Sequence, residues 1–427
     1  MSGWRSVFLR AFPTLAVCGS WLSLSFPQPG PVYVFRIVAI AVLPVLITSW
    51  LKSSHQSNSL VRWLVTLASV TLFWGLLSQF WAADALNSLV VTISVTLAIL
   101  SALSVLLAVQ QTSRGMEKLS QGLLIALGFL WALGGLQLVS GLSLSERVGR
   151  PWLFGEFLAG PFDNPNNFAV YLAGCAVPLI SKLAFPGNLL IRVLATSGLL
   201  VTVYFVAETG SRAGLALMLM VVVVVVMARI FREPVTLGYA FIIVAVTVSA
   251  LATWVWNSSE TLYVEYVYSG QQESDLLRLL LVQKGFEYLT SSFGSGVGAG
   301  QFESRLQQDG IAVTNAHNVF IEYVAEFGLP AVLLMVYSIM VVAVAYFRSG
   351  ATADLIERSN VLGVGLAYSC VIVIAGLVTS SSMEEPIWWV LIAALAASFT
   401  TGRDSTHFQL RTGKKDRSGW EHNEKSN

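Results

Sequence analysis

Three basic side chains between the middle of the chain and residue 317 have the types needed to act on an anionic or hydroxyl-bearing substrate: Arg212, Arg278 and His317. An arginine fork matches phosphate oxygens and stays charged at any relevant pH. A neutral imidazole, with an unperturbed pKa of about 6.5, can accept a proton near physiological pH. The same residue types also permit structural roles, so the surrounding sequence decides between the two.

Arg212 stands in VAETGSRAGLALM, where two apolar runs meet at Glu208. So short a linker predicts a tight turn at a membrane surface, with Arg212 opening the next helix. Charged residues at such a depth pair, snorkel to lipid phosphates or serve a function. Two interpretations stay open: an Arg212 held by Glu208 or lipid, and an anion site that faces an outer cavity.

Arg278 stands in QQESDLLRLLLVQKGFEYL, which predicts an amphipathic helix capped by Ser274 or Asp275. Arg278 would lie in the first turn, where the helix dipole favours anions, so a negative group nearby would explain a cation there. The other interpretation is an exposed arginine paired with Asp275 or Glu273. Capping explains the two acids more simply than a divalent-metal pair, and we predict neither a metal site nor a cofactor.

His317 stands in TNAHNVFIEYVAEFGLPA, where a polar stretch gives way to an apolar one. It is a loop residue, a helix cap or a base at the mouth of a membrane cavity. Asn318 is the better cap for the following helix, which leaves the imidazole available. Glu322 lies one turn beyond Asn318 and is placed to help orient a site. The apolar run is expected to break at Gly328-Leu329-Pro330.

Asparagines gather before another apolar run, in AGPFDNPNNFAVYLAG. Asn or Asp residues beside Pro165 are ordinary helix-start chemistry. Four polar residues in five positions exceed what a cap requires, so binding of sugar hydroxyls is the alternative. The residues concerned are Asp163, Asn164, Asn166 and Asn167.

Glycines alternate in FGSGVGAGQF, at positions 294, 296, 298 and 300. No Lys-Ser/Thr pair follows and no strand-to-helix context exists, so this is not a nucleotide-binding loop. Glycine permits positive φ and close approach of backbones. We expect the loop to pack against the surface of the helix bundle.

The whole chain is too apolar for a water-soluble globule of 427 residues. It is 55% hydrophobic and 11% charged, with a mean hydropathy of +0.70, whereas soluble domains carry about 25% charged residues. The net charge of +1 gives no indication of nucleic-acid binding, and we expect none. Cys18, Cys175 and Cys370 lie in apolar runs without metal-ligand spacing, so they are predicted to pack in the core.

About twelve apolar runs are long enough to cross a bilayer as helices, which takes roughly 20 residues each. The predicted fold class is therefore an all-α polytopic membrane protein with about 12 transmembrane helices. Arg5 and Arg10 precede the first run, which we expect to be retained rather than cleaved as a signal peptide. The runs are 7–25, 32–51, 61–81, 88–109, 119–140, 166–185, 189–208, 212–230, 236–256, 319–347, 360–380 and 386–401.

Basic residues predict the orientation of these spans. An even number puts both termini on one side, and that side collects 18 of the 25 Lys and Arg residues. The positive-inside rule makes that side cytoplasmic. Of the 24 acidic residues, 16 fall on the other side, which agrees with this assignment.

The domain organisation follows from the spans. Residues 1–401 form the predicted bundle, and it includes a large extracytoplasmic loop over 257–318 with an amphipathic helix. Residues 141–165 form a second long connection on that side. Residues 402–427 form a polar cytoplasmic tail that is predicted to be disordered. Chemistry is expected outside, where no ATP or nucleotide sugar is available.

Taken in order, the stretches FDNPNNFA, GSRAG, Arg278, GVGAGQF and AHNVFIEYVAEFGLPA resemble the O-antigen ligase and polymerase superfamily over roughly residues 155–335. The resemblance implies a GT-C-like, metal-independent, inverting glycosyltransferase of the bacterial inner membrane with a periplasmic active site. Its donor would be a glycan on undecaprenyl pyrophosphate. By position, Arg212 and Arg278 match the arginines assigned to the pyrophosphate, and His317 matches the base.

Three functions fit the sequence. A ligase would move the glycan to lipid A–core, and a polymerase for O-antigen or exopolysaccharide would use the same site with a second lipid-linked glycan as acceptor. The compact C-terminus and the FDNPNN form favour the ligase. A polysaccharide transporter or flippase would have charges buried at the membrane midplane. Here the polar residues cluster at the outer surface, and Arg36, inside the run 32–51, is the one exception. Asn164, Asn166, Asn167, Asn318 and Glu322 join the two arginines as expected substrate-binding residues.

Overall fold

The computed structural model describes residues 3–18, 23–24, 32–52, 59–141, 158–162, 164–184, 188–231, 274–311, 318–349, 355–379 and 385–400. These ranges are almost entirely helical, which confirms the all-α class. Ser23–Leu24 (β1) pairs antiparallel with Val32–Tyr33 (β2). The helices are α1 (Gly3–Val17), α2 (Val34–Leu51), α3 (Ser59–Ser78), α4 (Ala85–Gln110), α5 (Gly115–Ser140), α6 (Pro165–Ala184), α7 (Leu189–Glu208), α8 (Arg212–Phe231), α11 (Ser274–Ser291), α12 (Phe302–Gln308), α13 (Val319–Phe327), α14 (Leu329–Ser349), α15 (Leu355–Val378) and α16 (Pro386–Ser398).

Seven of the described helices are long and apolar enough to cross a membrane: α2 to α7 and α14. Shorter apolar helices lie within α8, α15 and α16. The chain is therefore a multi-pass membrane protein. The predicted run at 236–256 and the first part of the large loop, 257–273, lie outside the described residues. The total of about twelve spans and the extent of the loop stay predictions.

The apolar run at 319–347 contains two helices. α13 ends at Phe327, where Gly328 takes φ 66° and ψ −147°, and α14 begins at Leu329. Glycine reaches this backbone region without steric cost. The break predicted at Gly328-Leu329-Pro330 is therefore confirmed.

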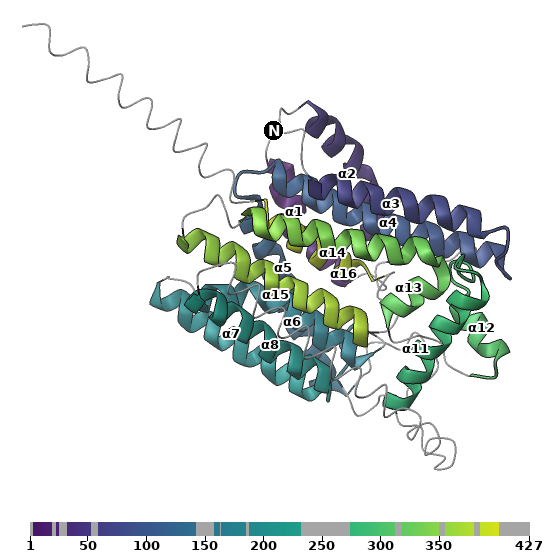
Figure 1. The fold of residues 1–427 in the computed structure, drawn as a ribbon. Coiled ribbons are helices and arrows are strands. Elements are labelled where there is room, and N and C mark those ends of the chain that lie inside the picture. Colours follow the sequence, from purple (N-terminus) through teal and green to yellow (C-terminus); the bar gives the residue numbers. More distant parts are fainter. Residues whose placement is uncertain are drawn as a thin grey trace, which may run out of the picture.

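The apolar helices run side by side, and α11, α12 and α13 gather at one end of the bundle (Figure 1). The closest pairs are α1 with α5, α3 with α4, α6 with α7 and α8 with α15. Arg5 donates to Ser49 Oγ at 2.7 Å, and Gln111 Nε2 donates to the Leu46 carbonyl at 2.8 Å. These bonds join the N-terminal helix, the end of α2 and the end of α4 at one site.

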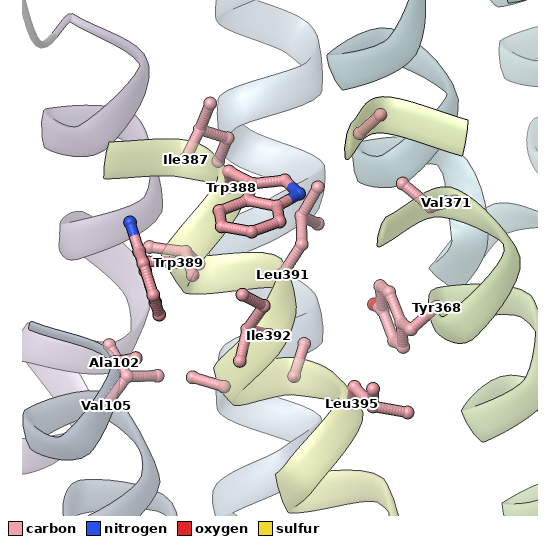
Figure 2. Packing of buried hydrophobic residues seen from close by; sticks show 14 of the residues in the cluster. Ala102, Val105, Tyr368, Val371, Ile387, Trp388, Trp389, Leu391, Ile392 and Leu395 are labelled. Atoms are coloured by element: carbon pink, nitrogen blue, oxygen red, sulfur yellow. The ribbon is translucent and has the colours of Figure 1, made fainter. Parts of the chain in front are cut away.

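α16 forms the centre of the core. All of its residues are buried, and a helix that is hydrophobic on every side belongs inside a bundle. Figure 2 shows its side chains between Ala102 of α4 on one side and Tyr368 and Val371 of α15 on the other. This packing fixes the frame on which the ends of the other helices are held.

Candidate active site

The glycine loop that follows α11 docks against the break between α13 and α14. Val297 N donates to the Ala325 carbonyl at 2.9 Å, and Leu329 N donates to the Gly294 carbonyl at 2.8 Å. A β-carbon at Gly296 would collide with backbone atoms of Glu326. The close approach expected of this loop is therefore confirmed. All four alternating glycines have positive φ: Gly294, Gly296, Gly298 and Gly300.

The loop is also bonded to the last part of α3, to the turn that follows it and to the start of α4. Trp74 Nε1 donates to the Ser295 carbonyl at 3.2 Å, and Trp81 Nε1 donates to the Gly296 carbonyl at 3.0 Å. Asn87 Nδ2 donates to the carbonyl of residue 300 at 2.9 Å. The loop thus holds α11 and α12 against the end of the bundle at which α3 ends.

α11 and α13 pack side by side and run parallel. Gly285 of α11 lies against Ile321 of α13, and Gly294, nine residues further, bonds to Leu329, eight residues further. Arg278 lies seven residues before Gly285, about two helical turns, whereas α13 begins only two residues before Ile321. Arg278 therefore lies beyond the start of α13 by roughly one and a half turns. Arg278 is partly buried there. The structure thus brings Arg278 to the N-terminal end of the helix that follows His317 in sequence.

Asn318 is the N-cap of α13. Its Oδ1 accepts hydrogen bonds from Phe320 N and Ile321 N, each at 3.1 Å. The predicted cap is therefore confirmed. Glu322 lies in the first turn and is partly buried. His317 lies outside the described residues, so its role as a base stays a prediction.

α8 brings Arg212 to the same end. α8 and α15 run antiparallel: Gly214 of α8 and Val371 of α15 pack on the same part of α6, at Ala169 and Gly174, while Ala228, further along α8, lies against Gly363, earlier in α15. Arg212 begins α8 sixteen residues before Ala228, which places it level with the end of α15. Gly376, in the last turn of α15, lies against Phe320 of α13. Arg212 is exposed, so its guanidinium is accessible at the end of the bundle where α13 begins.

The three asparagines at the start of α6 form its helix cap, with Asn164 before the helix and Asn166 and Asn167 in its first turn. Asn164 Oδ1 accepts from Asn166 N at 2.8 Å, and the Asn164 carbonyl accepts from Asn167 N at 3.0 Å. Asn164 and Asn167 are buried. Ser211, the residue before Arg212, donates to Asn166 Oδ1 at 2.7 Å. Asp163 lies outside the described residues, and sugar binding by the three asparagines stays a prediction.

One predicted helix start is corrected. α11 begins at Ser274, so Ser274 and Asp275 lie within its first turn rather than at the cap. Glu273 lies outside the described residues. Within the described ranges, no three His, Cys, Asp or Glu side chains gather as a metal ion would require.

An ion-pair cluster ties α11 to the end of α12. Lys284 Nζ lies 2.8 Å from Asp309 Oδ2 and 3.0 Å from Glu287 Oε2, and Tyr288 OH donates to Asp309 Oδ2 at 3.0 Å. Hydrogen bonds from Lys284 and then Tyr288 lower the pKa of Asp309. Hydrogen bonds to Asp309 and Glu287 raise the pKa of Lys284. The cluster keeps its charges at neutral pH and fixes the helix that carries Arg278.

An apolar cavity of about 700 Å³ lies between α3, α4 and α13 to α16. Val319, Phe320 and Tyr323 of α13 line one end, and Tyr346 and Phe399 lie deeper along the bundle. The lining is almost wholly hydrocarbon and aromatic, which suits a lipid chain. The cavity therefore begins beside the helix start that follows His317.

Two buried polar residues that the sequence analysis did not single out hold this region together. Ser211 caps α8, and Glu326, which is 2% exposed, accepts a hydrogen bond from Phe302 N at 3.3 Å. A serine before an apolar run is a cap signal, so Ser211 was within reach of sequence reasoning. Glu326 gives no such signal, because its partner comes from a separate segment.

Residues 191–336 match the family model for O-antigen ligases. The matched segment includes Arg212, Arg278, the glycine loop and His317, but not the asparagines that start α6. A curated relative, the teichuronic acid biosynthesis protein TuaE of Bacillus subtilis (strain 168), is 23% identical over 361 residues. The match covers 81% of this chain and 73% of that relative.

Proposed function

We propose that this chain, which carries the O-antigen ligase domain of the O-antigen ligase and polymerase superfamily, is an inverting glycosyltransferase of the bacterial inner membrane. It moves a glycan from undecaprenyl pyrophosphate to lipid A–core on the periplasmic face, and both of its termini are cytoplasmic. The observation that carries the proposal is the meeting of three segments at one end of the bundle. These are the start of α8 with Arg212, α11 with Arg278, and the start of α13 after His317.

The proposed chemistry needs one base and one anion site. His317 takes the proton of an acceptor hydroxyl as its oxygen attacks the anomeric carbon. The new glycosidic bond forms on the face opposite the breaking bond to pyrophosphate, and undecaprenyl pyrophosphate leaves. Arg212 and Arg278 stabilise the charge that builds up on the leaving group. Because pyrophosphate is already a good leaving group, no general acid is needed, and we propose that no metal is needed either.

The apolar cavity supports a lipid-linked donor. It begins at Val319 and Phe320, beside the proposed reaction site, and continues between α14 and α15. A hydrocarbon chain in that cavity would leave its pyrophosphate near the start of α13. The first turn of a helix favours an anion at such a place.

The proposal is tested in a strain whose own gene is deleted. Loss of a ligase leaves full-length glycan on the lipid carrier and uncapped lipopolysaccharide, and wild-type protein should restore capping. His317→Ala should reach the membrane at normal abundance and should not restore it. Wild-type capping by His317→Ala would reject the base role.

Polymerisation is the second candidate, and one observation favours it. The curated relative is named for the biosynthesis of teichuronic acid and not for lipopolysaccharide. The same site would then extend one lipid-linked glycan with another. The deletion strain separates the two functions, because loss of a polymerase leaves single repeat units rather than full-length glycan.

Transport is the third candidate that the sequence left open. Arg36 of α2 is buried and donates to Ser94 Oγ of α4 at 3.1 Å, so its charge is held inside the protein. A transporter would move lipid-linked glycan across the membrane without forming a glycosidic bond. Purified protein that joins donor and acceptor in detergent, where there is no membrane to cross, would exclude transport as the activity.

A further inference from the structure

The starts of α6 and α8 are joined through their capping residues. Ser211 Oγ accepts a hydrogen bond from Gly214 N at 3.0 Å, and the Ser211 carbonyl accepts from Leu215 N at 3.1 Å, which makes Ser211 the N-cap of α8. The same hydroxyl donates to Asn166 Oδ1 at 2.7 Å. Asn166 N donates to Asn164 Oδ1, the cap of α6. One continuous chain of hydrogen bonds therefore links the two helix starts.

Close packing reinforces this link. Gly214 lies so near α6 that a β-carbon there would collide with Ala169. Ser211 is 4% exposed, so its hydroxyl has little access to water. The turn before it is also tied down, because Thr209 Oγ1 accepts from Ser211 N at 3.1 Å and donates to the Val206 carbonyl at 2.6 Å. The position of the first residue of α8 is thus set relative to α6.

Arg212 is that first residue, and its side chain is exposed. A long, flexible side chain adopts many rotamers in water, so its backbone origin decides which region the guanidinium can reach. Ser211 fixes that origin from the preceding position. Asn166 fixes Ser211 from another helix.

We infer that Asn166 and Ser211 are positioning residues that aim Arg212 at the pyrophosphate of the donor, an inference that rests on the proposed function. Asn166 then acts through Ser211, because its Oδ1 accepts the serine hydroxyl. This differs from a direct sugar contact by Asn166, which would work whether or not Arg212 is present. Arg212 is the group that touches the donor.

The test is the dissociation constant of a purified undecaprenyl-pyrophosphate glycan, measured on full-length protein in detergent. Ser211→Ala and Asn166→Ala should each weaken binding roughly 3- to 10-fold, the range for one hydrogen bond. The double variant should be no weaker than either single one. Ser211→Thr and Asn166→Asp, which keep the hydroxyl and the acceptor oxygen, should restore binding.

Two further variants make the test specific. Thr202→Ala is the matched control, because Thr202 is also buried but, among the described residues, its hydroxyl bonds within its own helix, to the Gly198 carbonyl at 2.8 Å. It should bind donor as the wild type does. In an Arg212→Ala background, Asn166→Ala should cause no further loss. A thermal melt of each variant confirms that it is folded, and the two conservative variants test the inference even where an alanine variant is unstable.

The outcomes separate this inference from the proposed function. If Arg212→Ala binds donor normally, the pyrophosphate role of Arg212 is wrong and this inference falls with it. If Arg212→Ala weakens binding but Ser211→Ala does not, the positioning inference alone is overturned. An equal loss from Asn166→Ala with and without Arg212 would show a direct contact by Asn166 and would also overturn it.

Discussion

Gly285 of α11 lies directly against the Ile321 side chain of α13, where a β-carbon would collide with the isoleucine methyl group. This contact fixes how far α11 extends along the parallel α13, and it places Arg278 beyond the N-terminal end of α13. Gly285→Ala should push the helices apart and lower transfer activity, although alanine favours helix by up to about 1 kcal/mol.

The matched control for that change is Gly128→Ala. Gly128 also lies inside a helix, but its surroundings leave open space for a β-carbon. It should keep full activity. Ile321→Ala added to Gly285→Ala should restore activity, and equal losses from Gly128→Ala and Gly285→Ala would show that the contact with Ile321 has no special role.

Alanine substitutions at Gly296 and Gly310 should differ in their effects on stability, although the two glycines have similar φ angles. Gly296 has φ 79° and faces the backbone of Glu326 and Gly328, whereas Gly310 has φ 77° and open space around it. Gly310→Ala should therefore suffer only backbone strain, on the order of 1–2 kcal/mol. Gly296→Ala adds a backbone collision and should lower the melting temperature and the activity much further. Equal melting temperatures for the two variants would contradict the docking of this loop.

Asp309 predicts a dependence of stability on pH. Hydrogen bonds from Lys284 and Tyr288 hold its pKa below the usual value of about 3.9. A carboxyl with a lowered folded pKa adds stability above its unfolded pKa, and this is lost as the pH falls through the folded value. The melting temperature of the wild type should therefore fall below about pH 4. Asp309→Asn should have a lower melting temperature than the wild type at pH 7. Its melting temperature should also fall less as the pH is lowered.

The matched control is Glu287→Gln, which removes the other acid beside Lys284 and leaves Asp309 in place. Its melting temperature should fall at acid pH as that of the wild type does. The pKa of Lys284 is raised, so its effect on stability has the opposite pH dependence. Its stabilising contribution is present at neutral pH and is lost only as the pH rises through the folded pKa. A wild-type melting temperature that does not change at acid pH would contradict the stabilising role of the Asp309 cluster.

If the apolar cavity holds the lipid chain of the donor, blocking it should affect long-chain donors more than short-chain donors. Ile339 lines the cavity and is 69% exposed, while Leu333 on the same helix is 68% exposed and lies away from the lining. Ile339→Trp should obstruct the cavity and raise KM for a full-length polyprenyl donor more than for a short-chain donor. Leu333→Trp should leave both values unchanged. If Ile339→Trp changes KM by the same factor for both donors, the cavity is not the lipid site.

The sequence predicted those features that depend on neighbouring residues. α7 has the predicted bounds, 189–208, because an apolar run lies between turn residues. Asn318 caps α13 and Gly328 ends it, since capping and positive φ are decided within one turn. α1 ends at Val17, short of its predicted end at residue 25, because hydropathy marks an apolar run and not where a helix stops.

Contacts between distant segments could not be predicted in this way. Ser211 and Asn166 are 45 residues apart, and Trp81 and Gly296 are 215 apart. Hydropathy shows that a helix is apolar enough to cross a membrane, but it does not show which helix lies beside it. The parallel packing of α11 on α13 depends on one glycine, Gly285, whose role is visible only once both helices are placed.

The central claim is that His317 acts as the base while Arg212 and Arg278 hold the pyrophosphate. Its most direct test is transfer in vitro, with purified protein, lipid-linked glycan and lipid A–core in the presence of a metal chelator. Wild-type protein should form the product, and His317→Ala should lower turnover by about 100-fold or more with donor affinity unchanged. Arg212→Ala and Arg278→Ala should instead weaken donor binding as well as turnover. Wild-type turnover by His317→Ala would contradict the account.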